Sequence, residues 1–207
     1  MTISGARIAS GAAPVQKTSQ QTSQLLPTLF RNLDEERRLS VLHIGPTSSD
    51  TINFFSGFRC RLQVFDLFAE LPLPDIEETE RGLEPYLQEL LQFPADTRFD
   101  LCLFWDVFDY LDEDALPAFL SVLRPCLAAS TLAHGFTVHN PRTPANDVLY
   151  AIKGIDQLSL RSRPTPLPGY APHNQNKLKQ LLHCFRTERS VLLPDRRLEL
   201  LLRAKLD

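Results

Sequence analysis

The segment Phe99–Trp105 constrains the fold of this 207-residue chain most strongly. It reads Phe-Asp-Leu-Cys-Leu-Phe-Trp and stops at Asp106, so almost every position is apolar. Strands that are buried on both faces of a parallel sheet have such continuous apolar sequences. The segment therefore predicts a central strand of a sheet with helices on both faces.

Strand-like and helix-like segments alternate along the rest of the chain. Apolar residues at helical spacing predict helices over residues 21–36, 51–58, 83–93, 115–127 and 174–185. Strands are predicted over residues 39–44, 60–65 and 131–138, and over a hairpin made of residues 186–193 and 197–204. This order predicts an α/β fold: a Rossmann-like, doubly wound, mostly parallel sheet with an antiparallel C-terminal hairpin.

Two regions lack a strong periodic pattern. Residues 1–20 are rich in Ser, Ala, Gln, Thr and Gly, bury little apolar surface, and are predicted to be a disordered tail before a single domain over residues 21–207. Residues 140–172 contain several prolines and are predicted to be irregular, with one possible helix near 146–152.

Composition limits the compartment. The four cysteines form no C-x-x-C pair and most lie beside apolar neighbours, which indicates reduced, buried thiols. No apolar run approaches the ~20 residues that cross a bilayer, and the N-terminus lacks the pattern of a secretion signal. We therefore expect a cytoplasmic protein that does not enter a membrane.

Charge is distributed unevenly. Residues 1–141 carry 10 basic and 19 acidic side chains, whereas residues 142–207 carry 12 basic and 6 acidic ones. The basic region can attract an anionic partner. Its basic residues are dispersed rather than clustered, which is typical of a solvated surface, so nucleic acid is not the expected partner.

The order of segments resembles the class I S-adenosylmethionine-dependent methyltransferase family over about residues 22–205. The residues that carry the resemblance are Val41–Pro46, Asp66, Phe99–Asp106 and Leu123–Leu127. The resemblance implies that residues 21–207 are a methyltransferase-like domain. It also implies S-adenosylmethionine as the cofactor, and an unknown methyl acceptor that is a small molecule or a protein.

The expected cofactor site lies beyond the carboxyl ends of the strands, as in other open α/β sheets. Asp66 follows Ile44 by 22 residues, close to the spacing at which an acid accepts ribose hydroxyls, although it can equally be a simple strand terminator. The predicted cofactor-binding residues are His43, Gly45, Thr47, Asp66 and Asp106. Asp106 is also the best candidate for a catalytic residue.

Other residues near these strand ends have two interpretations each. His43 can contact a ligand or pack at a strand end, and Trp105 and Tyr110 can line the site or belong to the core. Ser48 and Ser49 are more simply a helix N-cap than a nucleophile. The histidines have no metal-site spacing, so no metal is predicted.

The glycine pattern departs from the family at two places. The family usually has an acid at the position of His43 and a run of glycines after Gly45, where this chain has Pro46, Thr47, Ser48 and Ser49. Before the fifth strand, the usual Pro-Gly-Gly is replaced by Ala128, Ala129 and Ser130. Glycine permits close backbone approach and positive φ. The alternative to an enzyme is therefore a non-catalytic scaffold or regulatory module that binds a protein partner or forms a homodimer.

Overall fold

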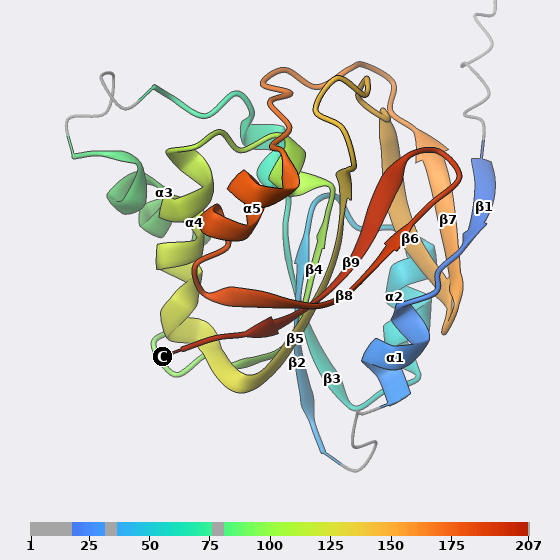
Figure 1. Ribbon diagram of the computed structural model, residues 1–207. Coiled ribbons are helices and arrows are strands. Elements are labelled where there is room, and N and C mark those ends of the chain that lie inside the picture. The colour runs from blue at the N-terminus through green and yellow to red at the C-terminus, as the bar shows by residue number, and fades with distance from the viewer. Residues whose placement is uncertain (1–17, 32–36, 76–80, 207) are drawn as a thin grey trace, which may run out of the picture.

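The predicted central strand, β4 (Phe99–Trp105), lies inside a six-stranded sheet with the order β3-β2-β4-β5-β9-β8 (Figure 1). The structure is a computed structural model that describes residues 18–31, 37–75 and 81–206. Four strands are parallel: β3 (Cys60–Phe65), β2 (Leu39–Ile44), β4 and β5 (Leu127–Val138). The hairpin of β8 (Phe185–Leu192) and β9 (Arg197–Ala204) adds two antiparallel strands beside β5. The predicted mostly parallel sheet with a C-terminal hairpin is confirmed.

Helices cover both faces of this sheet, as a doubly wound fold requires. One face carries α3 (Leu83–Leu91), α4 (Ala115–Leu123) and α5 (Gln175–Leu181), and the other carries α1 (Leu26–Arg31) and α2 (Ser49–Ser56) (Figure 1). Within β4, Cys102 and Phe104 pack on the first face, whereas Leu103 and Trp105 pack on the second. Burial on both faces explains why successive residues of this strand are apolar.

Three helices are shorter than their apolar patterns predicted, whereas α2 has the predicted length but begins and ends two residues earlier. α3 and α5 end two and four residues early, and α4 ends at Leu123, followed by a 3-10 turn over Arg124–Cys126. Pro125 lies in that turn and has no backbone N–H to continue the hydrogen bonds of the α-helix. No helix in the described ranges is long and apolar enough to cross a membrane.

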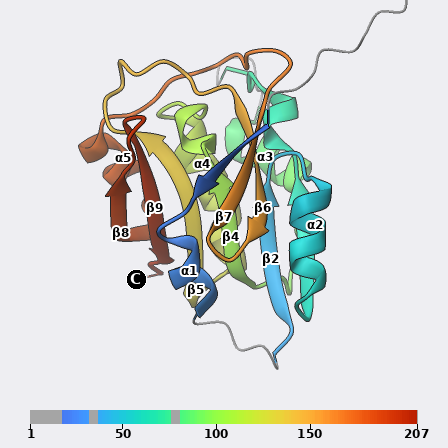
Figure 2. The same ribbon diagram turned by 90° about the vertical axis from the view of Figure 1, so that its right-hand side faces the viewer.

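A second, three-stranded antiparallel sheet covers the face that carries α1 and α2, and the sequence did not predict it. It has the order β1-β7-β6, with β1 (Thr18–Thr22), β7 (Gln157–Ser162) and β6 (Val148–Gly154) (Figure 2). The predicted helix near 146–152 is therefore wrong, and residues 148–162 are a hairpin rather than irregular chain. Burial of Tyr150, Ile152 and Leu158 against the main sheet favours the hairpin.

The predicted disordered tail is wrong for residues 18–20, and residues 1–17 lie outside the described residues. Thr18 pairs with Arg161 and Gln20 with Ser159, so these polar residues form an edge strand. Backbone pairing needs no apolar side chain, and most of β1 is exposed. The predicted helix over 21–36 begins at Leu26, and residues 32–36 lie outside the described residues.

A buried carboxylate fastens the start of α1 to the main sheet. Glu199 of β9 is fully buried and accepts hydrogen bonds from the Ser23 hydroxyl and, at 3.0 Å, from the backbone amide of Gln24. Nε2 of His134, on the neighbouring strand β5, lies 2.8 Å from Glu199. Ser23 in turn accepts the amide of Leu26 at 2.9 Å, which caps the first turn of the helix.

Candidate cofactor site

The carboxyl ends of β2, β3 and β4 meet at one edge of the sheet. Gly45 follows β2, Asp66 follows β3 and Asp106 follows β4, so the sequence correctly placed these three residues at strand ends. The backbone amide of Gly45 donates to the carbonyl of Phe65 at 2.6 Å, which continues the pairing of β2 with β3 for one more residue. This is the edge where open α/β sheets bind their ligands.

The backbone at Gly45 is covered by an aromatic ring. Gly45 has a φ of +112°, a conformation that side-chain-bearing residues rarely adopt. A Cβ at Gly45 would lie only 3.0 Å from the ring of Phe68, which belongs to a 3-10 turn (Leu67–Glu70) directly after Asp66. The space that this glycine provides is therefore taken by Phe68, whose side chain is buried.

Arg163 closes the same edge from a distant part of the chain. It directly follows β7, and its backbone amide donates to the carbonyl of Asp147 at 2.8 Å. Its guanidinium lies 4.4 Å from the ring centre of Phe68, within range of a cation–π interaction. One guanidinium nitrogen lies 3.7 Å from Oδ1 of Asp106, and the two side chains are only 5% and 7% exposed. Phe68 and Arg163 together form what we call the plug.

Aromatic stacking fills the space beside the plug. The rings of Trp105 and Tyr150 are parallel, with centres 5.4 Å apart, and Tyr150 also stacks on Phe136 at 4.9 Å. Of the two interpretations of Trp105, the structure supports core packing. Trp105 nevertheless has a φ of +51°, which is strained for an aromatic residue, and strained backbone is concentrated at functional sites.

Burial changes the ionisation of the groups at this edge. It raises the pKa of Asp106 to about 6, although the positive charge of Arg163 opposes the change. It raises the pKa of Asp109 to about 7, even though the hydroxyl of Thr137 donates to this carboxyl at 2.6 Å. Burial lowers the pKa of His43 to about 4, so its ring is neutral at pH 7. The edge therefore carries less charge than its residues suggest.

The five predicted cofactor residues have different surroundings. His43, Gly45 and Asp106 are buried, Asp66 is half-buried and Thr47 is exposed. The ring of His43 packs 5.5 Å from that of Trp105, which supports the packing interpretation. Burial also raises the pKa of Asp66.

Ser48, the first serine after Gly45, serves a structural role. Ser48 accepts the amide of Thr51 at 3.3 Å, so the N-cap interpretation is confirmed. Thr51 in turn accepts the amide of Ile152 at 3.1 Å, which ties α2 to the second sheet. Within the described ranges, no three His, Cys, Asp or Glu side chains are grouped closely enough to hold a metal ion.

Sequence reasoning missed Phe68, Tyr150 and Arg163. Phe68 follows Asp66 in a stretch without a motif, and Tyr150 and Arg163 belong to the region predicted as irregular. The only available signal was the excess of basic residues after position 141.

Several polar atoms around the plug are buried without a hydrogen-bond partner in the protein. They are Nδ1 of His43, Oδ1 of Asp66, Nε1 of Trp105, Oδ1 of Asp106, the hydroxyl of Tyr110, Oδ1 of Asp147 and Nε of Arg163. Buried polar groups are costly unless they form hydrogen bonds. These atoms would be satisfied by water or by a change in the position of the plug.

The fold has relatives among solved structures. A proposed methyltransferase from Thermobifida fusca YX has a TM-score of 0.52 and 11% identity, with 87% of this chain and 79% of that chain covered. The mostly parallel sheet and its terminal hairpin agree with this similarity. The chain has a class I methyltransferase-like fold. No protein-family model and no curated protein matches its sequence.

Two further structures are larger than this chain. The pyocyanin biosynthetic protein PhzM has a TM-score of 0.49 and 18% identity, with 87% of this chain and 54% of that chain covered. The mitomycin 7-O-methyltransferase MmcR has a TM-score of 0.49 and 16% identity, with 87% and 53% covered. The chain thus spans about half the length of these two proteins.

The residues at the strand ends do not fit S-adenosylmethionine in the conformation described. A cofactor at this edge needs open backbone at Gly45 and accessible carboxylates beyond β3 and β4. Phe68 occupies the first position, and Arg163 covers Asp106.

Proposed function

We propose that this chain is a methyltransferase-like module that acts by binding a partner and not by transferring a methyl group. The observation that carries the proposal is the plug. Phe68 lies where a cofactor would approach Gly45, and Arg163 lies against Asp106. The loss of glycines over residues 46–49 agrees with a site that no longer needs close backbone approach. Residues 128–130 lie at the amino end of β5, away from this edge, so their lack of glycine does not bear on it.

Opening the plug would be costly. Removing Arg163 from Asp106 separates a buried cation from a buried carboxyl, which typically costs about 3 kcal/mol or more. A ligand that binds only the open form loses that free energy, so its apparent affinity falls by roughly a hundredfold. The proposal therefore accounts for weak or absent cofactor binding without any change of fold.

Calorimetric titration with S-adenosylmethionine and with S-adenosylhomocysteine tests the proposal. We expect no binding of either compound at concentrations up to about 1 mM. A dissociation constant of that size corresponds to a binding free energy of only ~4 kcal/mol. The matched variant Phe68→Ala removes the ring above Gly45 and distinguishes a plugged site from one that lacks cofactor contacts altogether. Micromolar binding of either compound by the unaltered protein would overturn the proposal.

The second candidate is an S-adenosylmethionine-dependent methyltransferase whose plug opens. The observation that favours it is the set of buried polar atoms without partners, which includes Oδ1 of Asp66 and the hydroxyl of Tyr110. In this case Asp66 would accept the ribose hydroxyls, Asp106 would contact the methionine end, and a small molecule or protein would accept the methyl group. Cofactor binding that the variant Asp66→Asn weakens by about tenfold, one hydrogen-bonded contact, would support it.

A protein partner or a second copy of the chain is the proposed binding partner of the module. The excess of acid before residue 142 and of base after it favours an association between unlike surfaces. Sedimentation velocity at low and high salt tests self-association, because screening weakens contacts between exposed charges. A chain that stays monomeric at low salt contradicts the homodimer and leaves a different protein as the partner.

A further inference from the structure

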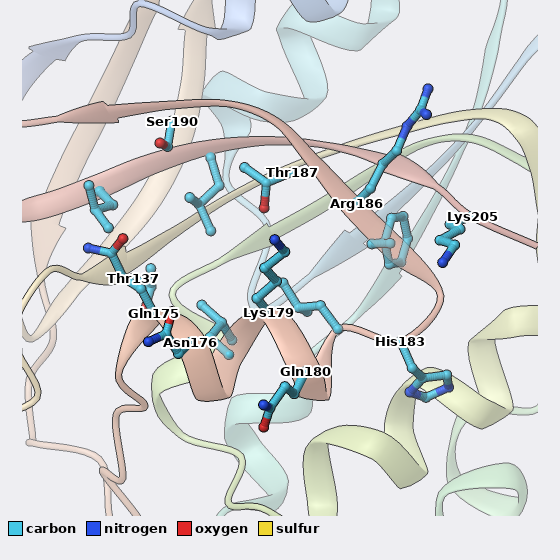
Figure 3. A pocket seen from close by; sticks show the side chains of 15 residues that line it. Thr137, Gln175, Asn176, Lys179, Gln180, His183, Arg186, Thr187, Ser190 and Lys205 are labelled. Atoms are coloured by element: carbon cyan, nitrogen blue, oxygen red, sulfur yellow. The ribbon is translucent and has the colours of Figure 1, made fainter.

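A cavity of about 750 Å³ lies away from the plugged edge, between α5 and the hairpin of β8 and β9 (Figure 3). Its volume is within the range of small-molecule sites. The apolar residues that line it are all buried: Leu178, Leu182, Phe185, Leu198 and Leu200. The cavity therefore has a closed apolar floor that can receive the body of an organic molecule.

The charged side chains that line this cavity are all basic. They are Lys179 of α5, Arg186 of β8 and Lys205 after β9, and His183 is a further nitrogen-bearing residue. Among the described residues, no carboxylate oxygen lies within 4 Å of the amino group of Lys179 or Lys205. Arg186 is 3.8 Å from Glu188, but Glu188 also pairs with Arg203. The cavity thus keeps, on Lys179 and Lys205, positive charge that no carboxylate of the described residues pairs with.

Side chains of α5, of the hairpin and of the segment after β9 line the cavity together. Figure 3 shows Lys179 rising from α5 toward Thr187 and Lys205 at one end of the cavity, whereas the guanidinium of Arg186 points away from both lysines. Thr137 and Gln175 lie at the other end. Arg186 pairs with Arg203 across the antiparallel hairpin, and Lys205 lies two residues beyond that partner.

We propose that this cavity is a binding site for a small organic anion with a compact apolar body and a phosphate or carboxylate group. The apolar body lies on the leucine and phenylalanine floor, and the anionic group meets the amino groups of Lys179 and Lys205. Charge-assisted hydrogen bonds hold the anion, while apolar burial supplies a further part of the affinity. Neither residue of the plug lines the cavity, so the proposal does not rest on whether the chain binds S-adenosylmethionine.

Three probes of related structure test the proposal by calorimetry or ligand-detected NMR. They are 1-naphthyl phosphate, which has both parts, inorganic phosphate, which has only the anion, and 1-naphthol, which has only the apolar body. We expect 1-naphthyl phosphate to bind at least about tenfold more tightly than either of the others, because each of them lacks one source of affinity. No binding of 1-naphthyl phosphate, or equal binding of 1-naphthol, overturns the proposal.

Variants locate the site. Lys179→Ala and Lys205→Ala should each weaken 1-naphthyl phosphate by about tenfold, the value of one charge-assisted contact. Both residues are exposed, so the fold should be unaffected. The control Lys153→Ala removes an exposed lysine of β6 outside the cavity and should leave the affinity unchanged.

Two further outcomes would contradict the assignment. Affinity that is the same in Lys179→Ala, Lys205→Ala and the unaltered protein would place the probe elsewhere. A glutamate-rich peptide that binds more tightly than 1-naphthyl phosphate and competes with it would assign the cavity to a protein partner. The titrations with S-adenosylmethionine are a separate measurement, so failure here leaves the proposed function standing, and the reverse is also true.

Discussion

At the scale of single residues, the contact between Arg163 and Asp106 determines the electrostatics of the strand-end edge. Both side chains are nearly inaccessible to water, and burial already raises the pKa of Asp106 to about 6. Without the guanidinium, this carboxyl would lose its nearest positive charge and would be harder still to ionise. Arg163 therefore stabilises the folded chain most where Asp106 is ionised, which is above its pKa.

The variant Arg163→Met tests this contact. We expect it to lower the free energy of unfolding by about 3 kcal/mol at pH 8, because a buried ionised carboxyl is left unpaired. The loss should be smaller at pH 5, where Asp106 is protonated. Urea unfolding at both pH values measures the difference. The control Arg161→Met removes a partly exposed ion pair with Asp50, and such pairs contribute only about 0–1 kcal/mol. An equal loss at both pH values would contradict the assignment.

Asp109 gives a second prediction at this scale. Burial raises its pKa to about 7, above the unfolded value of about 3.9. The folded chain therefore binds a proton more tightly than the unfolded chain, and this contribution to stability is lost as the pH rises toward 7. We compare the free energy of unfolding of Asp109→Asn with that of the unaltered protein at pH 4 and at pH 8. The difference, variant minus unaltered protein, should be about 3 kcal/mol larger at pH 8 than at pH 4. Urea unfolding at the two pH values measures it. Asp156→Asn, on an exposed turn, should show no such trend.

At the scale of elements, the Glu199 cluster holds α1 on the sheet. Burial alone would raise the pKa of Glu199, but hydrogen bonds from His134, Ser23 and the amide of Gln24 outweigh it and lower the pKa. A lowered pKa means that this stability is present above the unfolded pKa of about 4.3 and is lost as the pH falls through the lower folded pKa.

The variant Glu199→Gln should detach this element. The amide nitrogen of glutamine would face hydrogen-bond donors, so we expect a loss of about 3 kcal/mol at neutral pH, as for other broken buried networks. Limited proteolysis should then cleave near Ser23 before the rest of the chain unfolds. Glu188→Gln, in the exposed pair with Arg203, is the matched control and should change little. Protection of the Ser23 region in the Glu199→Gln variant would show that other contacts hold α1.

A comparison of the predicted and observed strands shows which parts of the fold could be predicted from the sequence. The strands β2, β3, β4 and β9 were predicted to the residue. β2, β4 and β9 are buried on both faces and have a local apolar pattern, whereas β3 is an edge strand in which apolar and polar residues alternate. The hairpin of β6 and β7 was missed because it lies between prolines and pairs with a strand more than a hundred residues away. β1 was missed because its residues are polar, and backbone pairing leaves no compositional signal.

The same limit applies to the candidate site. Strand ends carry a local signal, so Gly45, Asp66 and Asp106 were correctly placed at one edge. The plug that covers these residues has no local sequence signal, because Phe68 and Arg163 meet only once the second sheet has folded over the first. Whether the five predicted residues bind a cofactor stays a prediction.

At the scale of the whole molecule, the dependence of stability on pH is set by buried titratable groups, some of which stabilise the fold at high pH and others at low pH. His43 has a folded pKa of about 4, below its unfolded value of about 6.5, so its contribution is present above pH 6.5 and is lost as the pH falls toward 4. Asp106 and Asp109 have raised pKa values of about 6 and about 7, so their contributions are lost as the pH rises. Between pH 5 and pH 8 the two carboxyls outweigh the histidine.

The chain should therefore be less stable at pH 8 than at pH 5, by about 2 kcal/mol when the three linkage terms are combined. Thermal or urea unfolding across this range measures the difference. The double variant Asp106→Asn/Asp109→Asn removes both opposing groups and leaves His43, so its stability should rise from pH 5 to pH 8 instead. We use the sign of the slope of stability against pH as the criterion. General destabilisation lowers the stability at every pH but does not reverse this slope. If the double variant kept the falling slope, other groups would control the pH dependence, and the burial of Asp106 and Asp109 would not be its cause.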